Sequence, residues 1–327
     1  MLGKYKPAWT AFGIWLLSYK IQQPLNVDET VIAFYLSYLI TTAQNRKTGD
    51  YAVKNSLSAI QFYFSLAGKY APTSSPHIDL LKKSASRILQ PNKSRCEPVS
   101  AQDVYKVLHK SLTQKCLLRT RMHLTVFLLM FLGLFRFSDV QNILVHQELM
   151  RFMYTDSGQL DGVLIFISCS KTDQHWDGSW VAIGATGGNF CPVRLLIKLL
   201  DVGKYCRFAN NKDVGPLLRA VIHRHRPERY ELASISAPFS SPIASLSYSA
   251  FRESILELAG GSITKHIGLH SARTGGASTA AEHGIDSRLV CGHGRWQQGT
   301  TYADTYIKMM EGNMRKYFDL TRQIWKF

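Results

Sequence analysis

Apolar side chains recur three or four positions apart through most of the first ninety residues. Four segments show this pattern: 8–20, 28–42, 51–67 and 78–89. A stripe with this period buries one face of an α-helix. Asp28 precedes the second segment, where its carboxylate can cap the helix. The pattern therefore predicts a compact unit of four helices.

A polar stretch with two prolines follows this unit at 90–98 (QPNKSRCEP). Its composition is typical of a linker, because proline and short polar residues interrupt regular structure. Ser100 and Asp103 then match the capping box that begins a new helix. We place a helical domain at 1–90, a linker at 91–98 and a second domain at 99–327.

The second domain combines a buried helix with a hairpin. Residues 120–134 are apolar on nearly every side, as expected of a helix inside a core. Two β-rich runs, 162–170 and 179–183, are separated by the polar sequence KTDQHWDG. They predict a β-hairpin with a lysine-bearing loop. Helical patterns dominate from Pro192 onward. The predicted fold class is mainly α with a small β-hairpin or sheet (α+β).

The charge balance indicates a polyanionic partner. The chain has 327 residues, a formal net charge of +16 and a pI near 9.6. Nucleic acid is the leading candidate for such an excess of cations. The six cysteines form no CxxC pair, which favours reduced thiols in an intracellular protein. The most apolar run, 124–135, is too short to span a bilayer, so no membrane role is expected.

Arg136 is the first candidate for chemistry. It follows the buried helix, in the sequence GLFRFSDV. A charged side chain at such a place is costly unless it is paired or binds an anion. Asp139 stands three residues later and can pair with it. A purely structural ion pair is therefore the alternative to an anion site.

A second group of candidates lies in the last sixty residues. His270 and Arg273 are three apart, so a helix presents both on one face. Small residues follow them, which lets the backbone approach a bulky partner molecule closely, and a helix N-terminus favours phosphate. The sequence GHGRW, which contains His293, comes next, followed by Tyr302 and Tyr306. Such cations beside a phenol suit an attack by tyrosine on a phosphodiester.

These motifs together resemble the tyrosine recombinase (phage-integrase-like) family. The strings that carry the likeness are GLFRFSDV, SKTDQHWDG…CPV, LHSARTGGASTAAEHGI and GHGRW…YI, in that order. The sequences of these motifs are similar to those of recombinases of eukaryotic mobile elements of the DIRS and Crypton kind. The opening sequence PLNVDETVIAFYLSYL resembles the family's helical (SAM-like) core-binding domain. The resemblance covers nearly the whole chain and implies a site-specific recombinase or integrase.

The resemblance also implies roles for single residues. Arg136 and Arg273 are expected to bind the non-bridging oxygens of the scissile phosphate. Lys171 is expected to protonate the leaving 5′ oxygen. His270 and His293 complete the pocket. The tyrosine forms a 3′-phosphotyrosyl intermediate, and neither a metal nor another cofactor is needed.

Two tyrosines compete for the role of nucleophile. Tyr302 follows His293 by nine residues, which is the spacing in many members of the family. Tyr306 is followed by isoleucine and lysine, as in the mobile-element relatives. We expect Tyr306 to be the nucleophile. Asp139, Arg295 and Trp296 are further candidates for the pocket.

The family likeness implies double-stranded DNA and further copies of the chain, as a dimer or tetramer on DNA, as partners. Lys82, Lys83 and Arg87 are candidates for DNA contact by the first domain. The tail through Phe318, Leu320 and Trp325 is expected to expose aromatic residues, which are candidates for docking on a neighbouring protomer. If the source is eukaryotic, the expected location is the nucleus.

Two other functional classes remain open. A mobile-element descendant can keep the fold as a catalytically inactive, domesticated DNA-binding protein. A metal-dependent nuclease or hydrolase is the other alternative, with His223, His225 and His283 as ligands. The metal hypothesis is the weaker one, because no cysteine or paired acid accompanies these histidines in good register.

Overall fold

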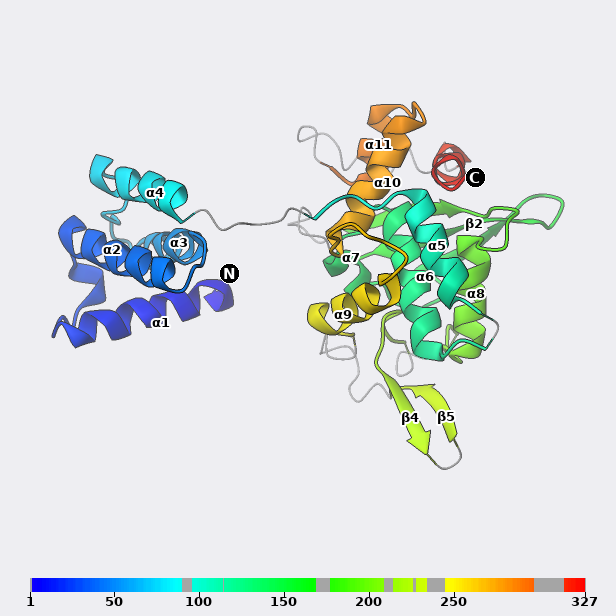
Figure 1. The fold of residues 1–327 in the computed structure, drawn as a ribbon, viewed down its shortest axis with the longest axis horizontal. Helices are drawn as coiled ribbons and strands as arrows, with labels where there is room; N and C mark the ends of the chain where they lie inside the picture. Colours follow the sequence, from blue (N-terminus) through cyan, green and yellow to red (C-terminus); the bar gives the residue numbers. More distant parts are fainter. Residues whose placement is uncertain are drawn as a thin grey trace. The chain divides into compact units, whose positions relative to one another are not determined.

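The computed structural model describes residues 2–89, 96–113, 115–168, 177–208, 214–225, 228–233, 245–296 and 315–326. The chain divides into two compact units, Met1–Ser94 and Arg95–Phe327. The described residues are mainly helical, with two small antiparallel sheets in the second unit (Figure 1). This is the predicted fold class.

The first unit consists of helices. They are α1 (Leu2–Ser18), the short 3₁₀ helix η1 (Pro24–Asn26), α2 (Glu29–Asn45), α3 (Tyr51–Leu66) and α4 (Pro76–Ile88). α1 packs on α3, and α2 packs on α4. Asp28 caps α2 as predicted, since its carboxylate accepts the backbone N–H of Val31 at 3.0 Å. The core between the helices contains Phe12, Ile60 and Phe64.

The second unit is built around one buried helix, α6 (Leu118–Leu132), in which every residue from Arg121 to Leu132 is buried. The longer helices that pack against it are α5 (Ala101–Ser111), α8 (Pro192–Val202), α9 (Tyr248–Ala259) and α10 (His270–Glu282). The predicted capping box at the start of α5 is confirmed. Two short helices, α7 (Phe137–Gln141) and α11 (Ser287–Gly294), complete this region.

The sheets differ in part from the prediction. β2 (Leu160–Ile167) and β3 (Ser179–Gly184) form the expected antiparallel pair, and β1 (Met150–Tyr154) adds a third strand that was not predicted. A second antiparallel pair, β4 (Val221–His225) and β5 (Glu228–Leu232), lies where helices were expected to dominate. Charged residues of both signs and histidines interrupt the apolar positions of this ribbon, so its alternation is weak in the sequence.

The tail after the tyrosines packs inside its own unit, and the expectation of exposed aromatic residues was wrong. Residues 315–324 form a helix in which Phe318 and Leu320 are buried, and Trp325 follows, also buried. The Trp325 indole donates to Phe190 O at 3.0 Å. A helix has an apolar face to bury, and one face of the three-stranded sheet supplies the surface, through Leu164 of β2 and Ala182 of β3.

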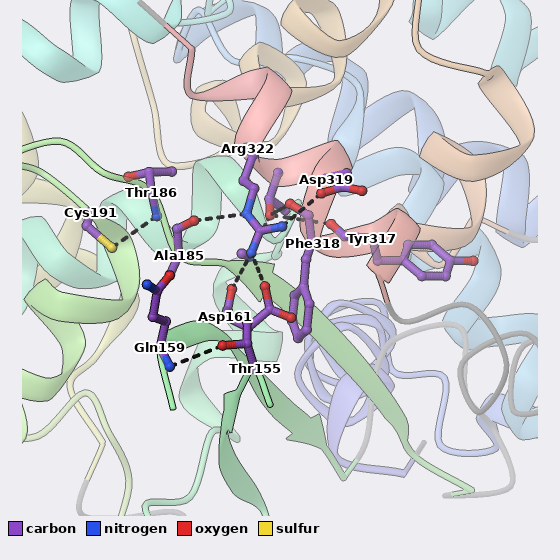
Figure 2. Close-up of polar contacts among 12 residues, drawn as sticks. Thr155, Gln159, Asp161, Ala185, Thr186, Cys191, Tyr317, Phe318, Asp319 and Arg322 are labelled. Atoms are coloured by element: carbon purple, nitrogen blue, oxygen red, sulfur yellow. Dashed lines mark hydrogen bonds and ion pairs between the residues drawn. The ribbon is translucent and has the colours of Figure 1, made fainter. Parts of the chain in front are cut away.

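Figure 2 shows the polar contacts that hold this last helix. The Arg322 Nε donates to Ala185 O at 2.9 Å, and Nη2 donates to Asp161 O at 2.6 Å. The same guanidinium forms ion pairs with the carboxylates of Asp161 and Asp319. The helix is therefore fixed to the end of β3 and the start of β2. Among the described residues, no helix has the length and apolar character to cross a bilayer.

Candidate active site

The end of α6 places Arg136. After Leu132 the chain turns through Gly133 and Leu134, and Leu134 takes a left-handed conformation with φ 48°. This turn reverses the backbone so that Arg136 becomes the N-cap residue of α7. The Arg136 side chain is half-buried, and its Nη1 is buried without a hydrogen-bond partner among the described residues.

α10 places His270 and Arg273 beside the same turn. A methyl group at Gly275 would overlap Val99 O, and one at Gly276 would overlap Phe131 O. These glycines therefore let α10 lie directly against the backbone of neighbouring segments of the protein. Their predicted use, as room for another molecule to approach, was wrong at these two positions.

Arg273 is the most enclosed of the candidate arginines, with 1% of its surface exposed. Its Nη1 donates to Leu134 O, and its Nη2 donates to Gly294 O at 2.6 Å. The guanidinium carbon lies 4.9 Å from the centroid of the Trp296 ring. Burial, reinforced by the charges of Arg295 and Arg136, lowers the pKa of Arg273 to about 9. Arg273 thus joins the turn after α6 to the end of α11.

Asp139 is the carboxylate of this cluster, and it is fully buried. Its Oδ2 accepts the backbone N–H of Arg136 at 2.9 Å and the Arg295 Nη2 at 2.7 Å. The Arg273 Nη1 lies 3.9 Å from the same oxygen. The expected side-chain pair with Arg136 is therefore replaced by ion pairs with two arginines that lie far along the sequence. Arg136 contributes its backbone instead of its guanidinium.

His270 and His293 differ in environment. His270 is the first residue of α10 and is exposed, and its pKa is lowered by partial burial and by the charges of Arg273 and Arg136. His293 is fully buried, and its Nε2 lies 2.8 Å from Leu132 O. Burial lowers the pKa of His293 to about 4, which leaves it neutral near pH 7. A neutral ring that bonds a carbonyl oxygen through Nε2 carries its proton there. The single N–H of His293 is therefore already used.

The other predicted residues lie elsewhere. Lys171, Tyr302 and Tyr306 fall outside the described residues. Three exposed cations of α4 lie on one helix, and we call them the α4 basic face: Lys82, Lys83 and Arg87. His223 and His225 belong to β4, and His283 follows α10. Within the described ranges, no three side chains of the kinds that bind metals come together.

The site also uses groups that the sequence did not single out. Three main-chain carbonyls accept bonds from candidate residues: Leu132 O from His293, and Leu134 O and Gly294 O from Arg273. The Phe135 ring lies beneath the Arg295 guanidinium at 5.1 Å. No side-chain pattern marks a carbonyl as an acceptor. The sequence could have indicated Phe135 as part of the site, because it adjoins Arg136 in the same motif.

Comparisons with known proteins give a limited result. No model of a protein family matches the sequence, and a comparison with curated proteins finds no match. Among solved structures, the chain is similar to one described as the XerH site-specific recombinase bound to palindromic difH substrate in a post-cleavage complex. The TM-score is 0.47 and the identity 16%, over 90% of this chain and 71% of that chain.

Proposed function

We propose that this chain is a DNA breaking-and-rejoining enzyme of the tyrosine recombinase type. The observation that carries the proposal is a cluster of three arginines: the guanidinium groups of Arg273 and Arg295 lie at the buried carboxylate of Asp139, and the charge of Arg136 acts on Arg273. The cluster holds more positive than negative charge, and two of its arginines have buried nitrogens without a partner in the described part of the chain. An anion with several oxygens satisfies such groups, and a phosphodiester is one.

The sequence supplies candidates for the reacting groups. In the proposed reaction a tyrosine oxygen, of Tyr306 or Tyr302, attacks phosphorus and the bond to the 5′ oxygen breaks. The products are a 3′-phosphotyrosyl link and a free 5′ hydroxyl. Lys171 gives the proton that the leaving oxygen takes up. Fixed arginines stabilise the charge that builds on phosphorus in the transition state.

His270 fits the role of proton acceptor from the attacking phenol. Its pKa is lowered, so the ring is neutral at physiological pH and has a free lone pair. It is exposed, which leaves it accessible to a bound substrate. His293 fits a different role, because its proton bonds the end of α6 and its ring is enclosed. We assign His293 to the support of the turn that carries Arg136.

DNA and further copies of the chain are the proposed partners. The α4 basic face presents three exposed cations, which suits contact with phosphates along a duplex. Strand exchange joins two cut duplexes, so it requires more than one active subunit. We propose assembly as a dimer or tetramer on DNA and an origin in a mobile element.

A suicide substrate tests the proposal. A nicked duplex that loses a short fragment after cleavage prevents rejoining and traps the covalent protein–DNA complex. Wild-type protein is expected to form this complex, with Tyr306→Phe inactive and Tyr302→Phe active. The opposite pattern would assign the reaction to Tyr302. Trapping by both single variants, or trapping that a chelator abolishes, would contradict the proposal, and loss upon chelation would favour a metal-dependent nuclease.

A second candidate function is DNA binding without turnover. The observation that favours it is that Arg273 and His293 donate hydrogen bonds to main-chain carbonyls of the protein itself. A domesticated descendant that only binds DNA has no need of those donors for substrate. Tight binding of duplex DNA by wild-type protein, with no covalent complex on any suicide substrate, would establish this alternative.

A further inference from the structure

Arg219 is a buried cation without an acidic partner among the described residues. It lies two residues before β4, and 8% of its surface is exposed. Its Nε is buried without a hydrogen-bond partner in the described part of the chain. Burial lowers the pKa of Arg219, and the described group whose charge opposes that shift is the Tyr205 phenol, not a carboxylate. A buried charge of this kind is costly unless it binds an anion.

Tyr205 does not replace the missing anion. The Arg219 guanidinium carbon lies 5.7 Å from the centroid of the Tyr205 ring, near the outer limit of a cation–π contact. The Tyr205 hydroxyl donates to Leu217 O at 2.6 Å, and burial raises the pKa of this phenol, so it stays neutral. The ring covers the guanidinium without accepting from its N–H donors, which lie in the plane of the group.

Ser245 supplies a second donor at the same place. Arg219 and Ser245 face each other in an antiparallel bridge, and we call these two residues the bridge pair. Residues directly opposite in such a bridge have Cβ atoms about 4.5–5.5 Å apart on one face. The Ser245 Oγ is also buried without a hydrogen-bond partner among the described residues. A guanidinium and a hydroxyl in this arrangement suit an anion with several oxygens.

The start of α9 favours an anion at the same place. Ser247 is the N-cap residue of α9, two positions after Ser245. Its hydroxyl accepts the Ala250 N–H at 3.2 Å, and the other N–H groups of a first helical turn have no acceptor within the helix. The partial positive charge of a helix N-terminus adds to that of the arginine.

α7 connects the bridge pair to the arginine cluster. Gln141, the last residue of α7, donates to Leu246 O at 3.1 Å. Phe137, the first residue, packs edge-on against the Tyr248 ring of α9 at 5.4 Å (Figure 1). Arg136 is the N-cap residue of α7, and a helix of five residues is about 7.5 Å long. Phosphates of one strand are about 3.4 Å apart along the DNA axis, so this length corresponds to about two nucleotides.

We infer that Arg219 and Ser245 bind a backbone phosphate of the DNA other than the scissile one. This inference rests on the proposed function, because it takes DNA as the substrate. Two unpartnered donors on one face of a bridge carry it, at a place where no described carboxylate neutralises the arginine. A carboxylate of a second copy of the chain is the competing acceptor, and the experiment distinguishes the two.

The salt dependence of DNA binding tests the charge. Affinity for a random-sequence duplex is measured over a range of salt concentrations, with Tyr302→Phe and Tyr306→Phe in every protein so that no covalent complex forms. Arg219→Met keeps the length of the side chain without its charge. It should weaken binding by about tenfold or more, and it should reduce the slope of log affinity against log salt by about 0.9, the value for one phosphate. The DNA-free variant should melt at the wild-type temperature or above it, because an unpaired buried charge has been removed.

Ser245→Ala removes a donor without changing the charge. It should weaken binding by about three- to tenfold and leave the salt slope unchanged. The double variant with Arg219→Met should lose less affinity than the product of the two single effects, because both donors hold one anion. Arg224→Met is the matched control, since Arg224 is exposed on β4 and already pairs with Glu231 at 2.6 Å. Its salt slope should change by less than half as much.

Several results would overturn the inference. They are an unchanged salt slope in Arg219→Met, an equal change in Arg224→Met, and a marked fall in the melting temperature of DNA-free Arg219→Met, which would show that the protein itself pairs the guanidinium. A changed sedimentation coefficient without DNA, with DNA binding unaltered, would assign the bridge pair to a second copy of the chain. The predicted changes in binding, with no covalent complex from wild type on any suicide substrate, would refute the proposed catalysis and support the phosphate site.

Discussion

Replacing Asp139 with asparagine tests whether its carboxylate holds the arginine cluster together. Asp139 is fully buried and accepts from Arg295 at 2.7 Å, with Arg273 at 3.9 Å. The variant keeps the size of the side chain and removes its charge. Two buried guanidinium groups are then left without a counter-ion.

The expected cost follows from these distances. Two unit charges 4 Å apart attract by about 4 kcal/mol at an effective dielectric constant near 20. Burial of the ions offsets part of this attraction, but the burial cost of the arginines remains when their partner is removed. Breaking a buried pair in this way costs about 3–5 kcal/mol. We expect Asp139→Asn to lower the free energy of unfolding by that amount.

Urea denaturation, followed by a spectroscopic signal from the second unit, measures the change in the free energy of unfolding. Asp286→Asn is the matched control, because Asp286 is exposed and caps α11 by accepting from the Arg288 N–H at 2.7 Å. Asparagine caps helices as well as aspartate does, so this variant should change stability by less than about 0.5 kcal/mol. If Asp139→Asn lowered the free energy of unfolding by less than about 1 kcal/mol, Asp139 would not hold buried charges together. The ion pairs that we assign to the arginine cluster would then be contradicted.

Three further predictions concern other parts of the molecule. Gly276→Ala should destabilise the second unit by about 3 kcal/mol or more in denaturation, because the added methyl group meets the backbone of α6. Gly187→Ala is the control and should be nearly neutral, because its methyl group has open space. Equal stabilities of the two variants would contradict the close packing of α10. The pKa of His293 is about 4 in the fold against 6.5 unfolded. The folded state therefore holds the ring neutral, and the free energy of unfolding is highest above pH 6.5 and falls as the pH is lowered towards 4. This pH-dependent part of the free energy of unfolding amounts to about 3 kcal/mol. His293→Gln should flatten the plot of unfolding free energy against pH across that range. Parallel plots for the variant and wild type would refute the burial argument. Replacing the α4 basic face with glutamine should reduce the salt slope of DNA binding by about 0.9 for each phosphate that the helix no longer neutralises, and an unchanged slope would remove α4 from the interface.

Local patterns predicted the elements whose causes are local. The cap at Asp28 and the capping box at Ser100 depend on residues three positions apart, and both are present. The hairpin of β2 and β3 follows from two β-rich runs joined by a short polar loop. The apolar period of α6 reflects burial on all sides, which the sequence displays directly.

The site was harder to predict because its bonds join distant segments. Asp139 was expected to pair with Arg136, three residues away, but Arg295 holds it from 156 positions along the chain. Spacing along a helix gives no information about such a partner. The tail shows the same limit, since Phe318 and Trp325 are buried against surfaces that only the folded unit provides. In both cases the determining contact is tertiary.

The glycines of α10 show why one pattern can support two interpretations. Gly275 and Gly276 allow close approach, and the sequence does not say what approaches. Backbone atoms of Val99 and Phe131 occupy that space. Small residues on a helix face more often serve the packing of the protein itself than contact with a ligand, and the short distance between α10 and α6 is the physical reason here.

The most direct test of the central claim is mass spectrometry of the trapped protein–DNA complex. The complex is digested with nuclease and protease, and the peptide that keeps a nucleotide is sequenced. We predict a nucleotide linked through its 3′ phosphate to Tyr306. A link through a 5′ phosphate, or no nucleotide on any tyrosine of an otherwise active protein, would contradict this mechanism.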